Sequence, residues 1–276
     1  QMGATGIIFE AGGNVNYSQL LDGINLSACA ISFEGVNDLT DYLTYAKKEG
    51  CSNEELSGYW NTNDVTDGSR LQTLVLEANE DSAVQQLKFL IEKTISFLDN
   101  NEARECPASK TLYKLPVGTN YFLEIAKFRA MRILLYQMLT SKGFSCAPED
   151  FEIMAISGIW KNEELGPHEN ILKGTTAAMA AIIGGCDALY IVPENPDQKL
   201  STRTSRNIST ILKEESFLNK EVDPGAGSFY IENLTNQLVN AVGIKSVKGP
   251  EEIDTTPVHG WMSSEHIEIM PWYTKA

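Results

Sequence analysis

The chain contains little histidine, and its cysteines form no recognisable motif. Only three of the 276 residues are histidines, and the five cysteines lack the CxxC spacing of zinc ribbons and redox pairs. His168 is expected to be a polar loop residue at a helix entrance. His259 and His266 have no carboxylates at metal-ligand spacing, so no metal site is predicted. The cysteines are expected to be reduced thiols of a cytoplasmic protein.

Long hydrophobic runs and an excess of positive charge are also lacking. No apolar run approaches the ~20 residues of a membrane helix, and no basic, apolar leader opens the chain. With 22 basic and 37 acidic residues the net charge is −15, which disfavours binding to nucleic acid or anionic membranes. We therefore expect neither partner. GxSxG, HExxH, GxxxxGK[ST] and Asp-rich calcium-loop motifs are absent as well.

Short apolar runs alternate with amphipathic stretches along most of the chain. This alternation predicts right-handed βαβ units and a parallel α/β fold. The predicted helices are Asn37–Lys48, Ser82–Leu98, Asn120–Thr140, Glu169–Ile183 and Thr202–Glu214. The predicted strands are Thr5–Glu10, Ala28–Phe33, Gln72–Glu77, Thr111–Val117, Phe151–Ser157 and Ala188–Val192.

An open doubly wound sheet and a closed barrel both satisfy this pattern. A (βα) barrel needs eight strands, whereas the pattern gives fewer. The missing strands would lie upstream of Gln1 or within residues 50–70, a polar segment that is otherwise interpreted as an excursion or small subdomain. Because the first residues already predict a strand, the chain is expected to begin inside a domain. The periodicity fails after Val242, so residues 243–276 are predicted to form an extended arm.

Two segments could carry chemistry but are interpreted as structural. In the predicted helix Asn120–Thr140, Glu124 and Lys127 lie three residues apart and two arginines follow, which is typical of a solvated face. The Gly-rich segment Asp223–Ser228 could hold an anion at the start of a helix. It is more simply a turn in which glycines permit positive φ and Ser228 caps the next helix.

Four segments together resemble the methylmalonyl-CoA mutase family of cobalamin-dependent acyl-CoA mutases, and they occur in the family's order. The resemblance covers roughly Gly3 to Val242. It implies a parallel (βα) barrel of TIM type at 1–242, incomplete in this chain, with acyl-CoA threaded along the axis and adenosylcobalamin held by a separate domain. The segments are Gly118–Leu135 ("NYFxEIAKxRAxRxLW"), Asn170–Gly185 ("NxxRxTTEAMAAxxGG", with Lys173 and Ala177 differing), Ser205–Ser216 ("ARNxQxxLxEES") and Asp223–Leu234 ("DPAGGSYYIExLT").

The departures from the family pattern fall on its functional residues. Catalytic chains carry a Tyr-His pair shortly before a segment similar to Ala78–Leu87, and counting back places that pair at Leu74 and Val75. Neither side chain can donate a proton or hydrogen-bond a thioester carbonyl. The cobalt-ligating DxHxxG motif is absent. The family's "SQTSGWSLT" segment keeps only a Ser-Gly and a Trp within Ile156–Asn162.

The resemblance therefore points to the small subunit of a heterodimeric mutase. Such a chain would have no catalytic, cofactor-binding or metal-binding residues, would bind acyl-CoA weakly or not at all, and would stabilise a large subunit that holds the adenosylcobalamin. Two alternatives are the substrate half of a split mutase and a stand-alone acyl-CoA-binding barrel. The tail Trp261–Thr274 resembles "WxTxEGIxIKPLYT", which lies before the barrel in the family. Its position here leaves open a permuted chain or pieces joined out of order.

Overall fold

A computed structural model of the chain describes residues 4–11, 15–36, 38–61, 70–101, 106–160, 169–243, 261–262 and 268–269. The chain divides into two compact units, Gln1–Ile244 and Lys245–Ala276. In the second unit, strands β9 (Trp261–Met262) and β10 (Glu268–Ile269) pair antiparallel. The first unit contains everything discussed below.

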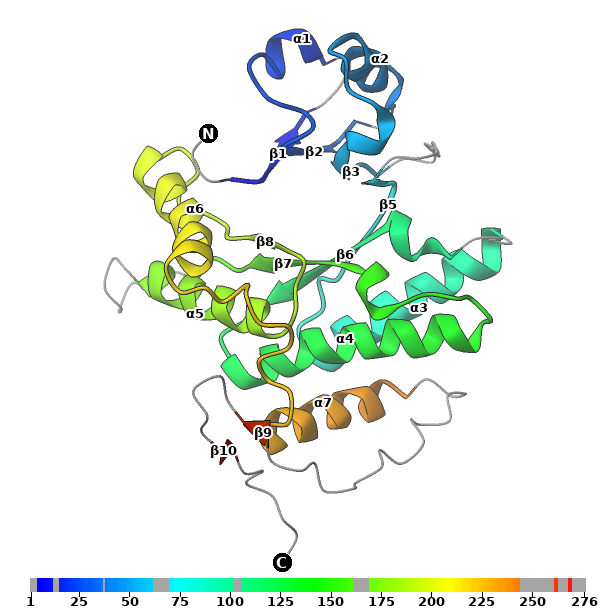
Figure 1. Cartoon of the computed structure of the whole chain (residues 1–276), viewed down its shortest axis with the longest axis vertical. Coiled ribbons are helices and arrows are strands. Elements are labelled where there is room, and N and C mark those ends of the chain that lie inside the picture. The colour runs from blue at the N-terminus through cyan, green and yellow to red at the C-terminus, as the bar shows by residue number, and fades with distance from the viewer. Residues whose placement is uncertain are drawn as a thin grey trace, which may run out of the picture. The chain divides into compact units, whose positions relative to one another are not determined.

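Strands and helices alternate through the first unit, as the sequence pattern predicts (Figure 1). The strands are β1 (Gly6–Glu10), β2 (Ala30–Glu34), β3 (Ser57–Tyr59), β4 (Arg70–Gln72), β5 (Leu74–Glu77), β6 (Thr111–Val117), β7 (Glu152–Ser157) and β8 (Ala188–Tyr190). The helices are α1 (Tyr17–Leu20), α2 (Thr40–Lys48), α3 (Ala83–Asn101), α4 (Tyr121–Ser141), α5 (Glu169–Ile183), α6 (Lys199–Glu214) and α7 (Phe229–Val242).

All the strands of this unit pair in parallel. The largest sheet has the order β5-β6-β7-β8, while β1 pairs with β2 and β3 pairs with β4. A parallel bridge between Phe33 and Trp60 connects β2 to the residue after β3. The fold is therefore mixed α/β with parallel sheets. Within the described residues, hydrogen bonds do not join these sheets into one closed sheet.

The polar segment 50–70 contributes a strand, which was one of the two places where a missing strand was expected. Strand β3 lies in it, and the backbone N–H of Tyr59 donates to the Ser32 hydroxyl at 3.0 Å. Gly58 has φ +130°, and a Cβ there would lie 1.9 Å from the carbonyl oxygen of Ile31. Only glycine allows β3 to approach β2 this closely.

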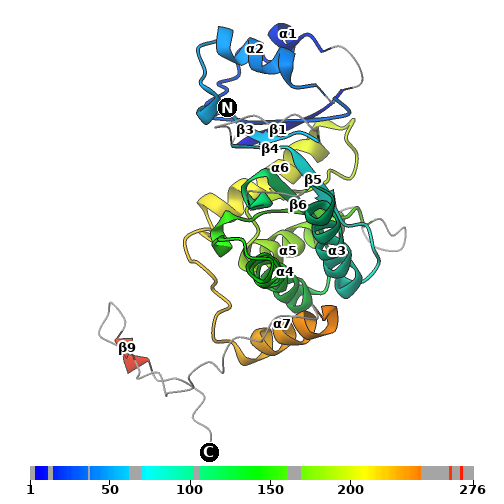
Figure 2. The ribbon, with the colours of Figure 1, turned by 90° about the vertical axis from the view of Figure 1, so that its right-hand side faces the viewer.

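The alternation of side chains along β6 divides the core. Tyr113, Leu115 and Val117 point to the helices and join a large cluster with α3, α4, α5 and α7, whereas Leu112 faces the opposite side. A second cluster packs β1 and β2 against α1 and α2, with Phe33 stacked on Trp60 at 4.4 Å between ring centroids. Figure 2 shows these helices on the far side of β1 and β3 from the larger sheet.

The prediction that Glu124 and Lys127 lie on a solvated face of α4 is wrong, because this helix is covered by the sheet and by other helices. Lys127 is 1% exposed and Glu124 is 6% exposed, with 2.6 Å between Nζ and Oε2. The Lys127 ammonium also donates to Gln86 Oε1 at 2.9 Å and to the Pro116 carbonyl oxygen at 2.6 Å. Burial lowers the pKa of Lys127, and the charge of Glu124 opposes that shift.

The two arginines of α4 join the segments that resemble the mutase family. Arg129 donates to Asp223 at 2.8 Å and to Glu232 on α7 at 2.7 Å. Arg132 donates to the Gly185 carbonyl oxygen at 2.8 Å and to Asp187 at 2.7 Å. Each arginine therefore links α4 to a segment that lies later in the chain.

The turn Asp223–Ser228 contains the positive φ that was predicted for a glycine. Gly227 has φ +77°, and Asp223 is itself left-handed at +50°. Ser228 occupies the N-cap position of α7, but its side chain makes no capping hydrogen bond.

Candidate functional site at the carboxyl ends of the strands

Charged and aromatic side chains meet where the parallel strands end, the edge at which open and closed parallel folds place their sites. Glu10 and Glu34 are register partners on β1 and β2, and Glu77 and Lys114 are register partners on β5 and β6. Lys114 is only 5% exposed. A buried ammonium of this kind requires charged or polar partners.

Lys114 finds its partners on other strands. Its ammonium pairs with the carboxylate of Glu34 on β2 and lies 3.7 Å from Glu77 Oε2. The Tyr59 hydroxyl on β3 donates to Glu34 Oε1 at 2.7 Å, and the ammonium stands 4.4 Å from the centroid of the Tyr59 ring. We call Glu34, Tyr59, Glu77 and Lys114 the strand-end cluster.

Two members of this cluster, Glu34 and Tyr59, have pKa values that are shifted away from neutral. Burial acts to raise the pKa of Glu34, but hydrogen bonds from Lys114 and Tyr59 and the lysine charge hold it below its usual value. Burial and the hydrogen bond to Glu34 raise the pKa of Tyr59 far above neutral. A general acid or base works best with a pKa near the operating pH. Glu34 stays ionised and Tyr59 stays neutral, so neither is suited to proton transfer.

Apolar side chains lie beside the strand-end cluster on the same face of the strands. Tyr59, Leu112 and Met154 form a cluster with residues of other strands, namely Ile8, Val75, Ile156 and Ala188. Val75 therefore lies in this apolar interior, opposite Leu112 in register, and Leu74 pairs with Thr111. Neither Leu74 nor Val75 carries a polar side chain.

The three histidines all lie outside the described residues. Within the described residues, no group of three His, Cys, Asp or Glu side chains could hold a metal ion. A helix long and apolar enough to cross a membrane is likewise not found among them. Trp160 lies within the described residues. Its backbone N–H donates to Asn170 Oδ1 at 2.8 Å, and this hydrogen bond connects the segment Ser157–Trp160 to α5.

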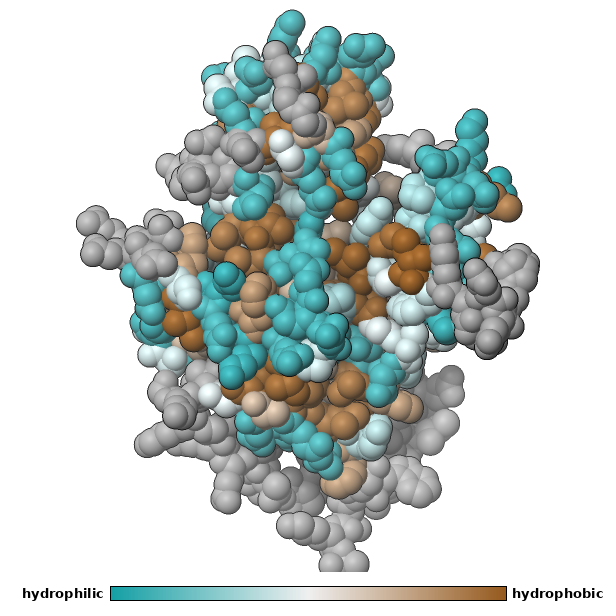
Figure 3. Space-filling view, turned by 180° about the vertical axis from the view of Figure 1, so that it is seen from behind, coloured by the Kyte–Doolittle hydropathy of each residue, from teal (hydrophilic) through white to brown (hydrophobic). Residues whose placement is uncertain are grey.

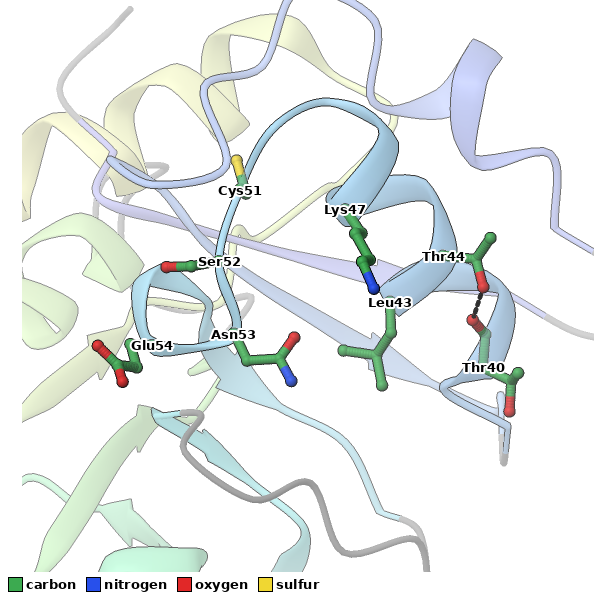
Figure 4. Close-up of a pocket in the computed structure, with 8 residues that line it drawn as sticks. All are labelled: Thr40, Leu43, Thr44, Lys47, Cys51, Ser52, Asn53 and Glu54. Atoms are coloured by element: carbon green, nitrogen blue, oxygen red, sulfur yellow. Dashed lines mark hydrogen bonds between the residues drawn. The ribbon is translucent and has the colours of Figure 1, made fainter.

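A surface hollow of about 680 Å³ lies elsewhere, along α2 and the turn that follows it (Figure 4). Its lining mixes apolar and polar groups, and the Thr44 hydroxyl in it is already bonded to the Thr40 carbonyl oxygen at 2.8 Å. No residue of the strand-end cluster lines it. The lining residues are Thr40, Leu43, Thr44, Lys47, Cys51, Ser52, Asn53 and Glu54.

The strand-end cluster was not predicted from the sequence, although Lys114 carried a signal. It lies in the middle of the apolar strand TLYKLPV, two residues from Leu112 and therefore on the same face. A lysine at a buried strand position requires a carboxylate partner. Glu34 and Glu77, which end β2 and β5, could have been considered as partners. Their meeting could not be derived without the register between strands.

The Glu34→Gln variant is expected to lose about 1–2 kcal/mol of stability at pH 7, because it removes the charged acceptor of Lys114 and Tyr59. A depressed carboxylate pKa contributes stability above the unfolded value of 4.5, and this is lost as pH falls through the folded pKa. Urea unfolding at pH 7 and pH 3.5 should therefore show the difference between wild type and variant shrinking in acid. A difference that stays constant with pH would contradict this account.

Comparisons with known proteins agree with the resemblance of the four segments. A family model described as methylmalonyl-CoA mutase matches residues 77–248. The methylmalonyl-CoA mutase small subunit of Porphyromonas gingivalis is 38% identical over 137 residues, which cover 48% of this chain and 22% of that protein. The small subunit of Streptomyces virginiae is 31% identical over 168 residues, 58% of this chain and 27% of that protein.

A large subunit is similar to this chain as well. That of Porphyromonas gingivalis is 35% identical over 130 residues, 45% of this chain and 18% of that protein. The matched part of the chain thus spans about a quarter or less of the length of these relatives. The family model covers more than half of the chain. It includes the helices α4, α5, α6 and α7 and the ion pairs of Arg129 and Arg132. The chain therefore belongs to the methylmalonyl-CoA mutase family.

Proposed function

We propose that this chain is the small subunit of a heterodimeric methylmalonyl-CoA mutase, a cytoplasmic complex that interconverts methylmalonyl-CoA and succinyl-CoA. The chain itself performs no chemistry and stabilises the large subunit. One observation carries the proposal: the positions aligned with the family's Tyr-His pair are Leu74 and Val75, and Val75 packs in an apolar interior. The proposed domain is a (βα) barrel over 1–242, with 50–70 as an insertion and 243–276 as an arm.

The barrel is supported by side chains rather than by backbone hydrogen bonds. The apolar cluster around Tyr59, Leu112 and Met154 takes in Ile8 of β1 as well as Ala188 of β8, the first and last strands of the series. Burial, followed by the charges of Glu10 and Glu34, raises the pKa of Tyr190 at the end of β8. Parallel strands whose first and last members face one interior favour a barrel over an open sheet.

The strand-end cluster supports weak or absent binding of acyl-CoA. In the family the thioester is expected to run along the barrel axis. Here the ion pair from Lys114 on β6 to Glu34 on β2 crosses that interior, and Tyr59 packs against it. A ligand along the axis would have to separate the desolvated Lys114 ammonium from the half-exposed carboxylates of Glu34 and Glu77, which disfavours binding.

Adenosylcobalamin is assigned to the large subunit, because the residues of this chain do not fit a cobalamin site. None of the three histidines stands in a DxHxxG sequence that could ligate cobalt. The polar groups of the strand-end cluster are already paired with one another. Bound to the large subunit, the cofactor would supply the radical chemistry of the rearrangement.

A partner subunit is supported by the similarity to both kinds of mutase subunit and by the surface. Both a small and a large subunit of Porphyromonas gingivalis resemble this chain. Phe122 on α4 is 49% exposed and Tyr230 on α7 is 56% exposed, and their rings meet edge to face at 5.4 Å. Figure 3 shows hydrophobic patches among hydrophilic ones on one face of the chain. Aromatic surface groups are enriched at protein interfaces.

The test is the behaviour of the isolated chain. Mixed with methylmalonyl-CoA and adenosylcobalamin it should show no turnover, and calorimetric titration with the thioester should show no binding heat. Turnover by the chain alone would overturn the proposal. Turnover that appears on adding only a cobalamin-domain protein would favour the split mutase, and tight thioester binding without turnover would favour a stand-alone binding barrel.

A further inference from the structure

The first and last strands of the parallel series each have one free edge. Among the described residues, β1 pairs with β2 alone and β8 pairs with β7 alone. Strands β4 and β5 are separated only by Thr73, whose N–H donates to the Lys110 carbonyl oxygen at 2.9 Å, so the two act as one strand. With β4 and β5 taken together, strands β1 to β8 are one fewer than the eight of a closed (βα) barrel.

The free edge of β1 can be assigned residue by residue. The Thr5 carbonyl oxygen accepts from the Ala30 N–H at 2.9 Å, and the Ala11 N–H donates to the Glu34 carbonyl oxygen at 3.0 Å. Alternate residues of a parallel strand direct their backbone groups to opposite sides, so the odd-numbered residues of β1 bond to β2. The residues of β1 whose N–H and carbonyl groups point away from β2 are Gly6, Ile8 and Glu10.

Side chains of the two edge strands face the same apolar interior. Ile8 of β1 and Ala188 of β8 both pack against the cluster of Tyr59, Leu112 and Met154. The three central residues of β1 are only half-buried, whereas the central strand β6 is buried at all positions but one. Parallel strands are normally covered on both faces and hydrogen-bonded on both sides. A further strand placed along these edges would therefore bury apolar surface and satisfy free backbone groups.

The described residues do not themselves supply that strand. A parallel strand after β8 requires a crossover helix, and α6 has this position, since its Ile208 and Leu212 pack with Ile191 just after β8. The chain then runs from α6 to α7 (Figure 1), and residues 215–228 between them contain no strand. The crossover is present within the described residues, but the strand to which it would lead is not.

We propose that the free edges of β1 and β8 together bind one extended peptide segment of another polypeptide, which enters as a strand parallel to both. Its backbone groups bond to β1 on one side and to β8 on the other, as in complexes formed by strand addition. Because side chains alternate along a strand, apolar residues at every second position face the cluster around Tyr59. This binding mode extends the barrel proposed above. Its test involves neither turnover nor the large subunit, so it and the subunit role can fail separately.

The experiment measures hydrogen–deuterium exchange of the full chain with and without a synthetic peptide in which valine and threonine alternate between terminal lysines. In the free chain, the edge strands β1 and β8 should exchange faster than the central strands β6 and β7. The peptide, at millimolar concentration, should slow exchange in β1 and in β8 together by about tenfold or more and leave β6 unchanged.

Two N-methylated peptides test whether both edges take part. Methylation of every valine nitrogen removes the N–H groups on one side of the strand, and methylation of every threonine nitrogen removes those on the other. Each should abolish the protection, because each removes the bonds to one edge.

Ile8→Pro is the matched change in the chain. It removes an N–H that points away from β2, so the β1–β2 hydrogen bonds remain while binding of the peptide is lost. If this variant fails to fold, the two methylated peptides still decide on the wild-type chain.

Three results would overturn the inference. The first is that the peptide protects neither edge. The second is that it protects one edge strand without the other. The third is slow exchange of both edges in the chain alone. Slow exchange that is independent of chain concentration would show that the chain fills the place itself, and slow exchange that grows with concentration would assign it to a second copy.

Discussion

Replacing Glu124 with alanine is expected to lower the free energy of unfolding by about 3–5 kcal/mol. The substitution leaves the Lys127 ammonium in an interior where the lysine is 1% exposed, with only the Gln86 side chain and the Pro116 carbonyl as acceptors. An unpaired buried charge costs far more than the ion pair itself contributes. Equilibrium unfolding in urea, monitored by circular dichroism, measures the loss.

The chain offers a matched control for this prediction. Lys88 and Glu92 also form an ion pair along a helix, 3.9 Å apart, but their side chains are 56% and 63% exposed. Glu92→Ala should therefore cost less than about 0.5 kcal/mol. The double variant Glu124→Leu with Lys127→Met should recover most of the stability, because it removes both charges together. A Glu124→Ala variant no less stable than Glu92→Ala would show that α4 is solvated after all.

Gly184→Ala is expected to destabilise the chain by about 3 kcal/mol, since the added methyl has no room. A Cβ at this position would lie 2.8 Å from the Ile125 carbonyl oxygen and 2.9 Å from Phe128 Cβ, both on α4. Neither atom can move without shifting the helix backbone. The close packing of α4 against the end of α5 therefore requires glycine, and thermal and urea unfolding should both detect its loss.

The neighbouring Gly185 is the control, because its requirement is of a different kind. It follows the end of α5 with φ +86°, and a Cβ there would meet nothing within 4 Å. Gly185→Ala should cost only about 1 kcal/mol, the usual penalty of a left-handed residue. Equal losses at the two glycines would contradict the proposed packing between α4 and α5.

The secondary structure was largely predictable because the helices and central strands have clear periodicity. The predicted bounds Thr111–Val117 and Glu169–Ile183 coincide with β6 and α5. Strand β3 was missed as a defined element, since Ser57–Tyr59 is three residues long and contains a glycine. Its place in the sheet depends on a close approach to Ile31 that no local pattern records.

The polar contacts were the least predictable part of the structure. The charges on α4 look like an ordinary solvated face, and only the tertiary arrangement shows that Lys127 meets Glu124, Gln86 and a carbonyl in the interior. Lys114 and Glu34 are 80 residues apart, so their pairing depends on which strands face one another. The loss of the family's Tyr-His pair at Leu74 and Val75 stays a prediction, because the matched family model begins at residue 77.

The most direct test of the central claim is co-expression of this chain with the large mutase subunit of the same organism, followed by size-exclusion chromatography with mass detection. We expect a stable one-to-one complex in which all turnover of methylmalonyl-CoA depends on the large subunit. A chain that elutes alone, while the large subunit is stable and active without it, would contradict the proposed role.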